Sequence, residues 1–175
     1  EKVKALSGAI AAGEADGAMY ASLGEAYKKA KNYPKAIQAL EKAAQLDSKN
    51  SALLISLADA QAKSGAAGAA IITYEQAVAM NPLYSKEYKE LGDLYMKQKK
   101  TAPAIKNYKK YLEKNRDNKI ARFVGDNALQ AKNYPEAIKY YGLISGKDAD
   151  DAALLKKYGQ ACFEAKDDHR AYQIY

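Results

Sequence analysis

The sequence repeats itself, and this repetition constrains its fold more than any other feature. The five residues AKNYP occur at positions 30–34 and again at 131–135, and the offset of 101 residues is one short of three 34-residue periods. When the chain is counted from Gly17 in units of 34, similar residues recur at positions 4, 7, 8, 11, 20, 24 and 27 of each unit. The unit at Asn118 starts one residue early, which accounts for the missing residue. Such a period predicts an array of similar structural modules.

Each unit predicts two helices. Positions 4, 7, 8 and 11 share one face of a first helix and positions 20, 24 and 27 share one face of a second, because both sets follow helical spacing. Position 8 is Gly in most units, as at Gly24 and Gly125. A Gly in a helix interior costs about 1 kcal/mol relative to Ala, so its recurrence predicts close packing of the two backbones. The Asn and Pro of AKNYP suit a cap and a first helical turn, which places this segment between paired helices.

This pattern resembles the tetratricopeptide repeat. That repeat has a large residue at position 4, Leu-Gly at 7 and 8, Tyr at 11, Ala at 20, an aromatic at 24, Ala at 27 and Pro at 32. The first full unit matches it with Tyr20, Leu23, Gly24 and Tyr27, whereas Gln61 departs from it at position 11. The resemblance implies an all-α fold, a right-handed α-solenoid of stacked antiparallel helix pairs with about eleven helices. It also implies a concave groove, lined by the first helices, that typically holds a peptide segment of a partner.

The alignment divides the chain into parts of one solenoid domain. We expect residues 1–16 to form the second helix of a preceding unit whose first helix is absent. Full units are expected at residues 17–50, 51–84, 85–117 and 118–151, and a shortened fifth at 152–175. The incomplete units at both ends indicate a piece of a longer array.

The composition argues against several classes of protein. The net formal charge of +7 permits an anionic partner without requiring one. The apolar runs are far shorter than the roughly 20 residues that a membrane span needs. His169 is the only histidine, and Cys162 is the only cysteine and falls at a packing position, so neither has the partners that a metal site or a catalytic triad requires. The sequence therefore predicts a non-catalytic protein without cofactor or metal.

The expected groove carries acidic and basic residues at fixed positions. Position 13 is Lys in three units, and position 9 is acidic in four. We call the four acidic residues the acidic row: Glu25, Asp59, Asp93 and Asp126. These residues predict ion pairs four apart on one helix, Glu25 with Lys29 and Asp59 with Lys63 among them, each worth about 0.2–0.5 kcal/mol. In the first two units the remaining groove positions, such as Ala21 and Ile55, are small or uncharged.

The second half of the groove is basic beside apolar side chains, and we predict the peptide-binding site there. The predicted site consists of Lys86, Lys89, Asp93, Met96, Lys119, Arg122, Asp126, Leu129, Lys156 and Phe163. A matching ligand alternates acidic and apolar residues. Arg122 is the doubtful member, because the unit is one residue short before Gly125 and its side chain could therefore point out of the groove. A solvated stripe of charge, without a ligand, explains the same residues equally well.

Two further functions remain open at the level of sequence. The basic residues could bind the backbone of a nucleic acid, although the acidic row argues against it. The chain could also associate with itself through the ends of the solenoid, where Leu6 and Tyr175 lie on faces that an adjoining helix would cover. The leading hypothesis is a scaffold for a protein partner.

Overall fold

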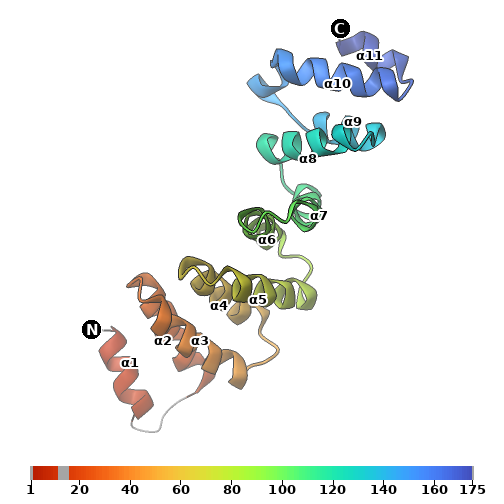
Figure 1. Ribbon diagram of the computed structural model, residues 1–175. Coiled ribbons are helices and arrows are strands. Elements are labelled where there is room, and N and C mark those ends of the chain that lie inside the picture. The colour runs from red at the N-terminus through yellow and green to blue at the C-terminus, as the bar shows by residue number, and fades with distance from the viewer. Residues whose placement is uncertain (1, 12–15, 175) are drawn as a thin grey trace. The chain divides into compact units, whose positions relative to one another are not determined.

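The structure is a computed structural model that describes residues 2–11 and 16–174. Within these residues it contains eleven α-helices, one short 3-10 helix and no strand, so the predicted all-α fold and its helix number are confirmed (Figure 1). The chain divides into two compact units, Glu1–Ala104 and Ile105–Tyr175, with the division inside α7 (Thr101–Leu112). The expected end face at Tyr175 lies outside the described residues. The extent of each sequence unit stays a prediction.

The first compact unit contains α1 followed by two helix pairs and α6. Its helices are α1 (Lys2–Ala11), α2 (Gly17–Lys29), α3 (Tyr33–Leu46), α4 (Ser51–Lys63), α5 (Ala67–Met80) and α6 (Ser85–Lys97). α2 packs against α3 and α4 packs against α5, while α1 contacts α2, α3 contacts α4, and α5 contacts α6. Each helix therefore contacts mainly its neighbours along the chain, as in a repeat array.

The second compact unit contains the remainder of α7 and two helix pairs. Its other elements are α8 (Asn118–Gln130), α9 (Tyr134–Tyr141), the 3-10 helix η1 (Gly146–Asp150), α10 (Ala152–Glu164) and α11 (Asp168–Ile174). α8 packs against α9 and α10 against α11, and α10 also contacts α8 and α9. Tyr108 of α7 packs edge-on against Phe123 of α8, with ring centroids 5.8 Å apart.

Small residues hold the paired helices close together, as the repeated glycines predict. A Cβ atom at Gly24 would lie 2.5 Å from Cγ of Leu40, and one at Gly125 would lie 2.7 Å from Cε1 of Tyr141. Both partner side chains are almost completely buried. A larger residue at either glycine would therefore push the two helices of the pair apart.

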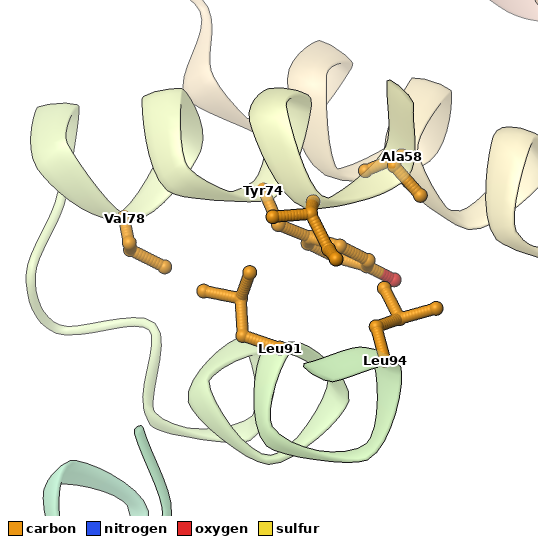
Figure 2. Packing of buried hydrophobic residues seen from close by; sticks show 7 residues of the cluster. Ala58, Tyr74, Val78, Leu91 and Leu94 are labelled. Carbon is orange, nitrogen blue, oxygen red and sulfur yellow. The ribbon is translucent and has the colours of Figure 1, made fainter. Parts of the chain in front are cut away.

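The core lies between successive helices rather than at one centre. In the first compact unit, Tyr74 and Val78 of α5 point toward Leu91 and Leu94 of α6, and Ala58 of α4 lies beside the Tyr74 ring (Figure 2). Ala70 and Ile71 complete this cluster. The tyrosine at position 24 is thus a packing residue, as the repeat pattern predicts.

Every first helix ends in the same turn. The residue that leaves the helix has a positive φ of 57–89° in each case, and these residues are Lys31, Gly65, Lys99, Lys132 and Lys166. The next N–H donates to the carbonyl five residues earlier, as from Asn32 to Tyr27 at 2.9 Å, which is the Schellman arrangement. The Asn32 side chain then accepts the N–H of Lys35, and Asn133 caps α9 in the same way. The predicted role of AKNYP is confirmed.

With eight residues, α9 is shorter than α3, α5 and α7, which have 14, 14 and 12. It ends at Tyr141, so Ile144, which is position 27 of this unit, lies beyond the helix and not on its face as the repeat pattern predicts. Gly142 follows directly, and Gly has a low helix propensity. The Asn118 side chain binds the turn instead, donating to the carbonyl of Ser145 at 2.9 Å and accepting its N–H at 3.3 Å. Ile144 remains buried all the same.

Candidate partner-binding surface

Four of the predicted site residues lie on α6 in the first compact unit. Lys86, Lys89, Asp93 and Met96 are three, four and three positions apart, so they share one face of the helix. Lys86 is exposed and Met96 is half-buried. Nζ of Lys89 lies 3.0 Å from Oδ2 of Asp93, which makes an ion pair along the helix. We call these four residues the α6 surface.

The other six lie on α8 and α10 in the second compact unit. We call Lys119, Arg122, Asp126, Leu129, Lys156 and Phe163 the α8–α10 surface. Lys119 and Lys156 are exposed, Leu129 is half-buried, and the Phe163 side chain is 69% exposed. Lys156 and Phe163 are seven residues apart on α10, so they share a helix face. The exposed ring and the two ammonium groups are available to a ligand.

Two carboxylates of this region are already paired. Asp126 binds Nζ of Lys157 through Oδ2 at 2.8 Å, so an ion pair joins α8 to α10. Asp151, which caps α10, binds Nη1 of Arg122 at 3.1 Å. The N–H of Leu154 and the Arg122 guanidinium lower the pKa of Asp151. Arg122 thus links α8 to the start of α10, and a ligand would have to compete with Asp151 for it.

The acidic row forms different ion pairs from those that the sequence predicts. Glu25 binds Lys28 at 2.8 Å instead of Lys29. Asp59 lies 3.7 Å from the same Lys28 ammonium, which reaches it from α2, instead of pairing with Lys63. For these two acids the predicted pairing is wrong. The Lys28 side chain lies between two helices and can meet both carboxylates, whereas Lys29 and Lys63 are exposed.

The acids of the row also bind tyrosine hydroxyls. The Tyr74 hydroxyl donates to Asp59, and the Tyr141 hydroxyl donates to Asp126 at 2.7 Å. Burial of each tyrosine and the adjacent carboxylate raise the pKa of both phenols. Sequence reasoning missed this bond. Its signal is a fixed separation of 15 residues between the acid at position 9 and the tyrosine at position 24.

Cys162 and His169 lack the surroundings that a catalytic cysteine and histidine need. Cys162 is completely buried, and this burial together with the nearby Asp167 raises the pKa of its thiol. A raised pKa lowers the fraction of reactive thiolate. His169 is exposed on α11. Among the described residues, no group of three His, Cys, Asp or Glu side chains could hold a metal ion.

The repeated units match a known family of repeats. Two models of the tetratricopeptide repeat match the chain, one at residues 27–92 and the other at residues 89–152. The chain belongs to the tetratricopeptide repeat family. Tetratricopeptide repeats generally serve as non-catalytic scaffolds for protein interactions, and their stacked helix pairs form an α-solenoid.

Solved structures of other proteins, two of which are described as tetratricopeptide repeat proteins, share this fold. MamA superposes with a TM-score of 0.67 at 21% identity, over 96% of this chain and 89% of MamA. YrrB, described as a TPR protein with an unusual peptide-binding site, gives a TM-score of 0.68 at 16% identity, over 98% of this chain and 89% of YrrB. A tetratricopeptide repeat protein from Parabacteroides merdae gives 0.65 at 20% identity, over 98% and 69%. No curated protein matches this chain. At these identities the likeness concerns the fold.

None of the helices that the structure describes is long and apolar enough to cross a bilayer. The buried apolar residues of the described helices face neighbouring helices, as in the cluster around Tyr74.

Proposed function

We propose that this tetratricopeptide repeat protein binds a peptide segment of a partner protein and catalyses no reaction. The observation that carries the proposal is the exposed Phe163 ring on the same helix face as the exposed Lys156. An exposed aromatic residue beside cations is a feature of binding surfaces, because aromatic side chains are enriched among the residues that dominate binding energy. The peptide-binding site for which YrrB is described supports the same use of this fold.

The ionic pairing of the α8–α10 surface indicates the charge of the ligand. Asp126 and Asp151 are paired with Lys157 and Arg122, respectively. Among the described residues, Lys119 and Lys156 form no such ion pair. Two ammonium groups therefore remain for a ligand, and their natural counterparts are carboxylates.

The apolar members indicate the rest of the ligand. On the α8–α10 surface, Phe163 and Leu129 would bind apolar side chains of the ligand. The ligand is therefore a peptide in which acidic and apolar residues alternate, either extended or as one short helix. The apolar contacts supply most of its affinity, since an exposed ion pair is worth only about 0–1 kcal/mol and mainly steers association.

A nucleic-acid backbone is a weaker fit for the same cations. Asp126 neutralises Lys157 and Asp151 binds Arg122, so few cations of the α8–α10 surface remain for a phosphate backbone, which is bound by many clustered cations. Contacts to phosphates also make affinity fall steeply with salt. The salt dependence of binding thus separates the two ligands.

The proposal is tested by selecting binders from a random peptide library displayed on yeast. We expect the selected peptides to alternate acidic and apolar residues, and to keep most of their affinity as the salt concentration rises. A single-stranded oligonucleotide of mixed sequence serves as the comparison ligand. Peptides without acidic residues, or tighter binding of the oligonucleotide with a steep salt dependence, would count against the proposal.

A further inference from the structure

The exposed side of α5 differs from those of the other second helices. With the 34-residue period, Ile72 is equivalent to Gln38 of α3 and to Lys106 of α7, and Gln76 is equivalent to Lys42 and Lys110. Three of these four equivalent positions are Lys and the fourth is a polar Gln. α5 has only one charged residue, Glu75. The exposed residues that we call the α5 face are Gly68, Ala69, Ile72, Gln76, Ala79 and Met80.

Large apolar side chains project from this part of the molecule. Ile72 is 60% exposed, Met80 is 45% exposed, and Leu83, which follows α5, is 72% exposed. Glu75 lies at the edge of the face, and its carboxylate accepts a hydrogen bond from the Tyr95 hydroxyl of α6 at 2.5 Å. Clusters of exposed apolar side chains on a soluble protein mark interaction surfaces.

A hollow opens on the same side of α5. It has a volume of about 440 Å³ and is lined by Gln76, Ala79 and Met80 of α5 together with Ala44, Ser48 and Leu54. Its lining contains no charged residue. The α5 face and this hollow share three residues, so projecting side chains and a recess that can receive them lie next to each other.

From this arrangement we infer that the α5 face binds the same face of a second copy of the chain. A two-fold interface requires one surface that is complementary to itself, and here Ile72 or Leu83 of each copy enters the hollow of the other. Charge favours the same face. Each chain carries a net charge of +7, so two copies repel each other elsewhere but meet without like-charge contact across an uncharged surface. This interface is separate from the ends of the array and from the peptide-binding surfaces.

The inference is tested by sedimentation equilibrium of the whole chain over a wide concentration range. We expect a reversible dimer, and we expect Ile72→Lys to weaken it at least tenfold. Lys occupies the equivalent position at Lys106, so this change is compatible with the repeat. The matched control is Gln38→Lys, which places the same charge at the equivalent position of α3 and should leave dimerisation unchanged.

A second variant, Leu83→Lys, tests the same interface even if Ile72→Lys does not fold. Leu83→Lys introduces the residue found at the equivalent Lys49, and it should weaken the dimer as Ile72→Lys does while circular dichroism stays that of the parent chain. A chain that remains monomeric at every concentration overturns the inference. So does a dimer that survives both changes, or one that is lost on Leu6→Lys alone, which would locate self-association at the end of the array.

Discussion

Lys28 and Phe163 occupy the same position of the repeat, position 12, yet the structure uses them in opposite ways. Lys28 of α2 is largely buried, with 15% of its side chain exposed, and it binds Glu25 and approaches Asp59 and Ser56 of α4. Phe163 of α10 is 69% exposed. In the α2–α4 region the charged residue at this position stabilises the stacking of two first helices. In the α8–α10 region that task falls to Lys157 and Arg122, and position 12 is apolar there, with the half-buried Leu129 on α8 and the exposed ring of Phe163 on α10.

The first and largest prediction concerns Phe163. Phe163→Ala should weaken binding of a selected acidic-apolar peptide at least tenfold, because burying a Phe side chain is worth about 1.5–3 kcal/mol. Isothermal titration calorimetry measures this change. The melting temperature should stay within error of the parent, since the ring makes few contacts in the unliganded protein. Unchanged affinity would remove Phe163 from the site.

The second prediction concerns the stability of the protein and Lys28. Lys28→Ala should lower the free energy of unfolding by about 1–2 kcal/mol, because it leaves two carboxylates close together without their shared cation. Lys156→Ala, at an exposed position, should change it by no more than about 0.5 kcal/mol. Urea denaturation of both variants gives the comparison. Equal losses of stability would show that the two regions do not differ in this way.

The third prediction concerns the response to acid. Burial alone would raise the pKa of Glu25, but hydrogen bonds from Lys28 and Ser56 and the charge of Lys28 lower it below its ordinary value of 4.5. A carboxyl whose pKa is lowered on folding stabilises the protein above the unfolded pKa, and this contribution is lost as the pH falls through the folded pKa. Glu25→Gln should therefore flatten the loss of stability below about pH 4.5 in acid titrations followed by circular dichroism. A titration curve identical to that of the parent would mean that Glu25 is not stabilised in this way.

The smallest predicted effect is that of reversing one exposed charge. Lys119→Glu should reduce the affinity for an acidic-apolar peptide only a few-fold, because an exposed ion pair contributes about 0–1 kcal/mol. Ala52→Glu places the same carboxylate at the equivalent position of α4, a charge change of −1 compared with −2 for Lys119→Glu, and should have no effect. Surface plasmon resonance would place most of the Lys119→Glu effect in the association rate. An equal effect of both changes would point to net charge rather than to a local contact.

The sequence predicts the helix pairs because their signals are local and periodic. Gly24 and Gly125 mark where two backbones approach, and AKNYP contains both the cap and the turn. Each of these features depends on residues within one unit, whose spacing can be counted. The all-α fold and the family could therefore be predicted before any coordinates.

The partners of charged side chains could not be predicted in the same way. Lys28 binds across to α4, Arg122 binds the cap of α10, and Asp126 binds a tyrosine and Lys157. These contacts depend on the offset between successive units, which a spacing within one helix does not fix. Long side chains can also reach two acids at once. The predicted site residues are consequently known by their faces and exposure, while their joint use by one ligand stays a prediction.

We propose that the partner binds through the α8–α10 surface and not in the α2–α4 region, and backbone amide NMR distinguishes these two possibilities. The ¹⁵N-labelled chain would be titrated with a selected acidic-apolar peptide, and amide shifts would be followed residue by residue. We predict the largest shifts around Lys119, Leu129, Lys156 and Phe163, with little change around Ala21 and Ile55. Shifts confined to α2 and α4, or to the second helices of the pairs, would show that the peptide binds elsewhere.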